Sequence, residues 1–178
     1  MILTDHTIKE SISNGTIVIE PFVVSNLGTN SYDVRLGKTL ALYKDDILDA
    51  KKHNEIEMFD ISEDGYVLEP GNLYLGVTEE YTETHIHIPF LEGKSSVGRL
   101  GIDIHATAGK GDVGCCNHWT LEISVSKPVR VYHLMPIGQL IYFEAQGEVD
   151  TLYSQKGSAK YNHRSPYPME SMMWKNKF

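Results

Sequence analysis

Long apolar runs, cysteine and an excess of positive charge are missing or scarce in this sequence. No run approaches the roughly 18 apolar residues that predict a membrane-spanning helix. The first residues also lack the basic start and apolar core of a signal peptide. The two cysteines, Cys115 and Cys116, are adjacent, so an ordinary structural disulfide between them is geometrically unfavourable. These absences predict a cytoplasmic protein, in a reducing compartment, without a membrane partner.

The charge balance is acidic, with 16 Lys and Arg against 24 Asp and Glu and a formal net charge of −8. Broad nucleic-acid binding needs a basic surface that displaces counterions, so we expect no nucleic-acid partner. A small anionic ligand needs only a local group of cations and is compatible with this balance. The 178 residues are enough for one domain with a substantial core, and we expect a single domain over 1–178.

Short strands separated by turns dominate the pattern along the chain. Thr4 or Asp5 can cap a helix that runs through Ser13, with Gly15 as its stop. After it, β-branched or alternating segments predict strands at 16–19, 23–24, 31–37, 66–68, 73–77, 85–88, 121–125, 129–132 and 139–143. Turn-forming groups lie between them, among them 69–72, 127–128 and 135–138. The expected fold is therefore mainly β, a sandwich or jelly-roll-like barrel, with a helical turn at 94–99 and a polar segment from about residue 147.

One polar stretch has a composition suited to phosphate binding and to polarising a small substrate. It is Glu92-Gly93-Lys94-Ser95-Ser96-Val97-Gly98-Arg99-Leu100-Gly101, followed by His105 to Gly109 and by Asp112. The stretch is not a P-loop, because that motif needs a glycine five positions before Gly93, where the residue is Ile88.

Catalytic zinc is excluded by a second missing motif. Zinc deaminases hold their metal with an H-x-E followed later by a P-C-x-x-C. His53-Asn54-Glu55 matches the first half, but Cys115-Cys116 lacks the spacing of the second. His85 and His87 alternate along a predicted strand and would face the same side, which indicates packing or surface chemistry. We therefore expect no protein-bound zinc.

Glu122 is the most informative acidic residue. It lies between Leu121 and Ile123 in a strongly apolar strand, where an unpaired charge is costly to bury. If the strand is central, the carboxylate needs a partner, and Arg99 is a candidate. The alternative is an outward-facing strand glutamate, and by the same reasoning Asp112 would be an ordinary turn residue.

Several spaced motifs resemble the dCTP deaminase family, relatives of the trimeric dUTPases. They cover most of the chain in the family's order: Leu3-Thr4-Asp5, Pro21-Phe22, Ser31-Tyr32-Asp33-Val34-Arg35-Leu36-Gly37, the run from Glu92 to Glu122, Met135-Pro136-Ile137-Gly138-Gln139, Tyr153 and Ala159-Lys160-Tyr161. The resemblance implies a distorted jelly-roll of the dUTPase-like type, assembled as a homotrimer with active sites between subunits. It also implies that residues from about 150 to 178 form a flexible lid.

The resemblance implies zinc-independent hydrolytic deamination of a cytosine nucleotide. Glu122 would be the general base and proton shuttle, while Ser95 and Arg99 position the water and stabilise charge growing on it. The implied substrate-binding residues are Lys94, Ser96, Ala108, Asp112, Thr120, Leu121, Tyr153, Lys160 and Arg164. Among these, Asp112 would meet the sugar, and Lys94, Ser96, Tyr153 and Lys160 the phosphates. Mg²⁺ would be bound through the phosphates, and dTTP is the expected feedback inhibitor.

Two segments depart from the family pattern. The stretch after Asp112 is Val113-Gly114-Cys115-Cys116-Asn117-His118-Trp119, where the family usually has a proline or alanine and then glycine, an aromatic residue and glycine. In the tail, Arg164 stands where a glutamine is common, which leaves the terminal-phosphate contact and the choice between dCTP and dCMP open.

The leading interpretation is a dCTP deaminase that makes dUTP. Gly93-Lys94-Ser95-Ser96 with Thr107-Ala108-Gly109 leans towards a bifunctional enzyme that also releases dUMP and pyrophosphate. Three further interpretations stay open: an enzyme that accepts dCMP, as in viral-type members acting in a host cytoplasm, a plain dUTPase, and a catalytically silent nucleotide sensor. Intact Ser95, Arg99 and Glu122 argue against the silent sensor.

Overall fold

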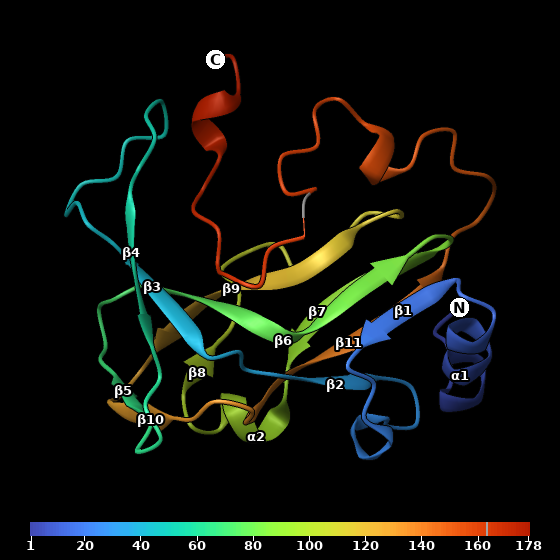
Figure 1. Cartoon of the computed structure of the whole chain (residues 1–178), viewed down its shortest axis with the longest axis horizontal. Coiled ribbons are helices and arrows are strands. Elements are labelled where there is room, and N and C mark those ends of the chain that lie inside the picture. Colours follow the sequence, from blue (N-terminus) through green and yellow to red (C-terminus); the bar gives the residue numbers. More distant parts are fainter. Residues whose placement is uncertain (163) are drawn as a thin grey trace.

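The computed structural model describes residues 1–162 and 164–178 and is mainly β, with a short helix at its N-terminus (Figure 1). The helix α1 spans Asp5–Ser13, with Thr4 at its N-cap and Ile8 buried. Gly15 follows the helix with φ +78°, a left-handed conformation that glycine adopts without strain. The predicted helix and its stop are confirmed. No described helix has the length and apolar character needed to cross a membrane.

The strands form one large sheet and two smaller ones. The large sheet has the order β4-β3-β6-β9-β8, with β1 paired to one end of β6; the others are β2-β11-β7 and β10-β5. The bounds are β1 Ile17–Glu20, β2 Tyr32–Arg35, β3 Thr39–Tyr43, β4 Ile56–Asp60, β5 Tyr66–Leu68, β6 Tyr74–Thr84, β7 His87–Gly93, β8 Ile102–Asp103, β9 Cys116–Val125, β10 Val129–Val131 and β11 Pro136–Glu144. Short helices are η1 Val24–Asn26, α2 Ser95–Gly98, η2 Tyr153–Gln155 and η3 Met173–Lys175. The mainly β class is confirmed, and the described strands do not join into one closed barrel.

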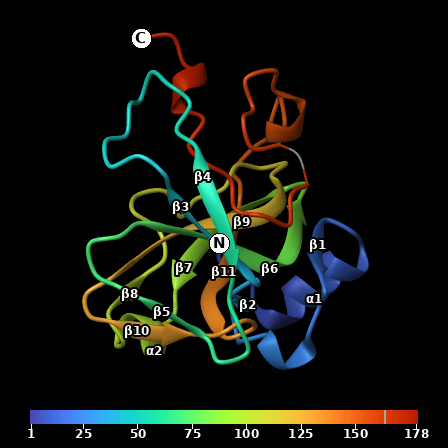
Figure 2. The same ribbon diagram turned by 60° about the vertical axis from the view of Figure 1, so that its left-hand side comes forward.

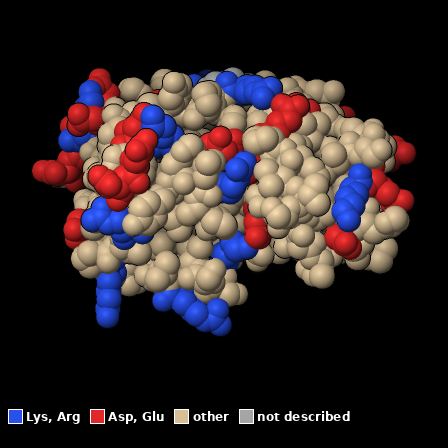
Figure 3. Space-filling model, turned by 60° about the horizontal axis from the view of Figure 1, so that its bottom comes forward, with Lys and Arg blue, Asp and Glu red and all other residues tan. Residues whose placement is uncertain are grey.

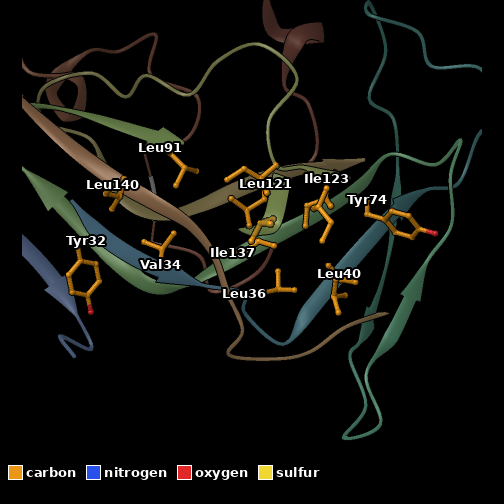
Figure 4. Close-up of a cluster of buried hydrophobic side chains, with 14 of the residues drawn as sticks. Tyr32, Val34, Leu36, Leu40, Tyr74, Leu91, Leu121, Ile123, Ile137 and Leu140 are labelled. Carbon is orange, nitrogen blue, oxygen red and sulfur yellow. The ribbon is translucent and has the colours of Figure 1, made fainter. Parts of the chain in front are cut away.

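The core lies between the large sheet and the β2-β11-β7 sheet. Inward side chains from both meet there, as Figure 4 shows for Val34, Leu91 and Leu140 on one side and Leu40 and Leu121 on the other. All five are at most 2% exposed. Because side chains alternate along a strand, burying one face fixes the direction of the intervening residues.

That alternation decides where Glu122 points. Its neighbours Leu121 and Ile123 are fully buried in the core, so the carboxylate faces the opposite side of β9. Residues directly opposite each other on antiparallel strands share a face. Glu122 pairs with Leu75 on β6, and Leu75 pairs with Ala41 on β3. These three residues define what we call the outer face of the large sheet.

Three local predictions were wrong. The segment 23–24 leads into the 3₁₀ helix η1 rather than a strand. The turn predicted at 135–138 lies earlier, where Leu134 has φ 64°, and β11 already begins at Pro136. His85 and His87 do not share a strand face, because β7 begins at His87 and His85 lies in the preceding turn.

His87 gives the fold a predicted pH dependence. Its side chain is buried, with Nε2 3.3 Å from Ser11 Oγ, and burial lowers the imidazole pKa despite the opposing charge of Glu144. A lowered folded-state pKa means that the unfolded chain takes up the proton more readily as pH falls below about 6.5. We expect the free energy of unfolding to fall from pH 7 to pH 5, and to fall less in a His87→Asn variant. Urea unfolding at both pH values measures this free energy, and a variant at the exposed His85, His85→Asn, is the control. An equal fall in the free energy of unfolding in all three proteins would refute the prediction.

Candidate active site

Glu122 lies on the outer face, half-buried in the middle of β9. Its Oε2 accepts a hydrogen bond from the Ala106 backbone N–H at 2.8 Å. Its own backbone N–H donates to Ile104 O at 2.9 Å, which ties the strand to the loop that carries Ala106. The second carboxylate oxygen forms no hydrogen bond with the described residues. The sequence indicated Arg99 as the partner of this carboxylate, but within one chain the partner is a backbone amide.

The carboxylate opens into a cavity of about 760 Å³, which lies within the usual range for small-molecule sites. Five of the sequence-predicted site residues line it: Ala108, Asp112, Thr120, Glu122 and Tyr153. Leu121 does not, because its side chain points into the core from the other face of β9. These five residues come from the loop before β9, from β9 itself and, for Tyr153, from the tail. Their roles in binding and catalysis stay predictions.

The loop from Ala106 to Asp112 reaches its position through close backbone packing. At Gly109 an added Cβ would lie 2.4 Å from Leu91 O, too close for any other residue without a shift of β7. The Gly109 carbonyl accepts a hydrogen bond from the Leu91 N–H at 2.7 Å. Asp112 at the end of the loop pairs with Lys110 at 2.8 Å. Glycine thus allows the loop to lie against the sheet and present Ala108 and Asp112 to the cavity.

The stretch 113–119, which departs from the family pattern, also contributes to the lining of this cavity. Cys115 lines the cavity, and burial raises the pKa of its thiol to about 11, so it is protonated at neutral pH. Cys116 begins β9 and its Sγ lies 3.4 Å from Asn162 Oδ1. Trp119 is anchored by its indole N–H, which donates to Thr82 Oγ1 at 3.0 Å. The unusual residues are therefore held by the sheet rather than by a free loop.

The residues on and beside α2 do not reach this cavity. Lys94, Ser95, Ser96 and Arg99 are all absent from its lining, and the last three are exposed. The Lys94 ammonium forms an ion pair with Asp33 on β2. Figures 1 and 2 both place α2 at the end of the molecule opposite the C-terminal segment. Seen from the α2 side, acidic and basic side chains are interspersed without a single patch of either sign (Figure 3).

Of the predicted site residues in the tail, one lines the cavity and two do not. Tyr153 lines the cavity, and its hydroxyl accepts a hydrogen bond from the Tyr161 N–H at 3.2 Å. Lys160 instead bonds to Asn176. Arg164 lies 3.9 Å above the ring of Tyr81 and forms a 3.1 Å ion pair with Glu20. The phosphate contacts predicted for Lys160 and Arg164 stay predictions, and His163, which precedes Arg164 in the sequence, lies outside the described residues.

The sequence missed the residues that cover the outer face. They are Tyr43 and Leu48 from the β3–β4 hairpin together with Tyr161, Met169, Glu170 and Ser171 from the tail. The available signal was the group of apolar residues Met169, Met172, Met173 and Trp174, which is unusual for a frayed end. The tail beyond residue 164 packs back onto the sheet, for example through the Met169 N–H and Thr120 Oγ1. The flexibility of the lid stays a prediction.

Comparisons with known proteins agree on one family. A family model described as dCTP deaminase-like matches residues 2–145. A protein of Clostridium acetobutylicum named dCTP deaminase, dUMP-forming, is 45% identical over 177 residues, covering 99% of this chain and 98% of the relative. A protein of the same name from Cytophaga hutchinsonii is 47% identical over 163 residues, covering 92% and 91%.

A crystal structure of 2′-deoxycytidine 5′-triphosphate deaminase from Agrobacterium tumefaciens shares the fold. Its TM-score is 0.66 with 23% sequence identity, and the match covers 81% of this chain and 48% of that longer chain. At this identity the likeness supports the architecture alone.

Proposed function

This chain belongs to the dCTP deaminase-like family, and we propose that it deaminates dCTP and also hydrolyses the triphosphate, releasing ammonia, pyrophosphate and dUMP. The observation that carries this proposal is the full-length similarity to relatives named dUMP-forming, joined to a family carboxylate that faces a nucleotide-sized cavity. The sequence alone favoured dUTP as the product. The similarity favours the bifunctional enzyme instead.

In the deamination step, water adds to C4 of the cytosine ring as Glu122 takes its proton. The proton passes to ring N3. Glu122 then moves the proton of the new C4 hydroxyl to the amino group, the C4–N bond breaks, ammonia leaves and the C4 carbonyl of uracil remains. The geometry suits this role, because Ala106 N–H fixes one carboxylate oxygen at 2.8 Å and the other is left to exchange protons. Positioned proton transfer of this kind contributes about 10²- to 10⁴-fold in rate.

Ser95 and Arg99 complete the proposal only if they come from another subunit. They are exposed on and beside α2, away from the cavity of their own chain. In a homotrimer, the state expected from the family, a neighbouring α2 would stand over each Glu122 and supply donors for the attacking water. Contact of this kind uses one patch of each chain against a different patch of the next, and it closes into a ring.

The phosphates of the nucleotide would be bound by Tyr153 of the same chain and, like the water at Ser95 and Arg99, by Lys94 of a neighbouring subunit. The three carboxylates that line the cavity are already engaged: Asp112 with Lys110, Glu122 with the Ala106 amide, and Glu170 with His53. This donor set fits Mg²⁺ held mainly by phosphate oxygens and water, the usual arrangement for this ion. When bound, Mg²⁺ would neutralise phosphate charge.

The product distribution tests the proposal. We expect incubation with dCTP and Mg²⁺ to yield ammonia, pyrophosphate and dUMP in equal amounts, measured by chromatography and an ammonia assay. Parallel reactions with dCMP and dUTP define which phosphates are required. Ammonia with stoichiometric dUTP and no pyrophosphate would identify a monofunctional deaminase. Pyrophosphate from dUTP without ammonia from dCTP would identify a plain dUTPase, and no turnover a silent nucleotide-binding protein.

A further inference from the structure

The wall opposite Glu122 comes from the last residues of the same chain. Met169, Glu170 and Ser171 line the cavity that Glu122 enters. The Met169 N–H donates to Thr120 Oγ1 at 3.1 Å, two residues from Glu122 on β9. This contact places the segment against the outer face, where it lines the cavity beside Glu122. The segment is therefore built into the site, although it lies far from Glu122 in the sequence.

Two side chains of the β3–β4 hairpin hold that wall. The Tyr43 hydroxyl accepts a hydrogen bond from the Ser171 N–H at 3.0 Å, and His53 Nε2 lies 3.0 Å from Glu170 Oε1. The indole of Trp174 packs edge-on against the His53 ring, with centroids 5.8 Å apart. Figure 1 shows the C-terminal segment rising beside β3 and β4. We call the Tyr43–Ser171 and His53–Glu170 contacts the hairpin clasp.

Strand register explains why Tyr43 can take this role. Ala41 pairs with Leu75, and Leu75 pairs with Glu122, so all three lie on the outer face. Tyr43 is two residues beyond Ala41 and shares that face because side chains alternate along a strand. The central strands β3, β6 and β9 therefore present Tyr43 and Glu122 to the same cavity, and Tyr43 reaches across it to the tail.

We propose that Tyr43 and His53 are positioning residues of the active site, which hold residues 169–171 as the wall beside the cytosine ring of the nucleotide. The proposal rests on the proposed function for the identity of the substrate. Its physical basis is that a wall held beside the carboxylate and the reacting ring restricts the access of bulk water to both. Neither residue exchanges a proton with the substrate.

Tyr43→Phe and His53→Phe are the variants that test the clasp. Each removes one contact while keeping most of the side-chain volume, and a single net hydrogen bond predicts a loss of about 3- to 10-fold in kcat/KM. The double variant should lose about 10- to 30-fold, since both contacts hold one segment. If the wall excludes water, kcat should fall as well as KM rise. Tyr132→Phe and His6→Phe, on exposed residues elsewhere, are the matched controls.

Hydrogen exchange provides a readout that does not depend on turnover. Amides in a peptide covering 169–172 should exchange faster in both clasp variants, while urea unfolding of the β core stays unchanged. Faster exchange with unaltered kinetics would show that the wall plays no part in the reaction and overturn the proposal. Unchanged exchange would overturn it too. Wild-type protein that never deaminates dCTP would contradict the proposed function instead, and the exchange experiment would still test the clasp.

Discussion

Glu122→Gln is expected to abolish deamination while leaving nucleotide binding largely intact. Glutamine has nearly the same shape, and its amide oxygen can still accept the hydrogen bond from Ala106 N–H that now reaches Oε2 at 2.8 Å. The cavity should therefore keep its form. The amide cannot take a proton from water or deliver one to N3, so the loss falls on the transition state. Turnover should fall by at least about 100-fold, the lower limit for a positioned general base.

Two measurements separate chemistry from binding in this variant. Single-turnover ammonia release gives the chemical step, and equilibrium dialysis with dCTP gives the dissociation constant. Glu57→Gln, at an exposed position on β4, controls for the loss of one negative charge. A Glu122→Gln protein that retained more than about a hundredth of the wild-type rate could not have lost its general base. A large rise in the dissociation constant would instead assign Glu122 to binding.

The features that sequence predicted well follow from one-sided burial. In β9 the alternation of Leu121 and Ile123 with Thr120 and Glu122 predicted the strand, and the burial of both apolar residues then shows the side to which the carboxylate points. The same alternation predicted β2, and the positive φ required after α1 marked its end at Gly15. Local pattern and tertiary packing agree in these segments, so the pattern is informative.

Segments that were missed lack that agreement. Thr39, Leu40 and Ala41 at the start of β3 are all buried, because the large sheet is covered on both sides there, and alternation disappears. Arg99 was a candidate partner of Glu122, but within one chain that partner is the Ala106 backbone N–H. A pairing between subunits stays a prediction. The two residues belong to one continuous motif, but Arg99 contributes nothing to the lining of the cavity into which Glu122 points. Proximity along the chain does not predict proximity in space.

The wall from the tail could not be derived from local pattern at all. Met169 and Ser171 are placed by backbone hydrogen bonds to Thr120 Oγ1 and to the Tyr43 hydroxyl. Ser171 and Tyr43, which lies on β3, are 128 residues apart in the sequence. No periodicity within the tail itself encodes these contacts.

Mixing two inactive variants should restore activity if the active site is shared between subunits. Glu122→Gln lacks the carboxylate, and Arg99→Ala lacks the guanidinium proposed to act on the next chain. In a ring of subunits, a site is intact when Glu122 comes from an Arg99→Ala chain and Arg99 comes from a Glu122→Gln chain. Random exchange of equal amounts makes each condition true half the time, so about a quarter of the sites should be active. Either variant alone should be near background.

The controls make the result specific to a shared site. Wild type mixed equally with Glu122→Gln should give about half of the wild-type activity, because only the carboxylate is diluted. Glu122→Gln mixed with a chain that carries both substitutions should stay inactive, since no chain supplies Glu122. Subunits are exchanged by mild denaturation and refolding, and light scattering reports the assembly. If exchange is complete and the first mixture is still inactive, Arg99 does not act across a subunit boundary. The exposure of Arg99 and its absence from the cavity of its own chain would then mean that it takes no part in the reaction.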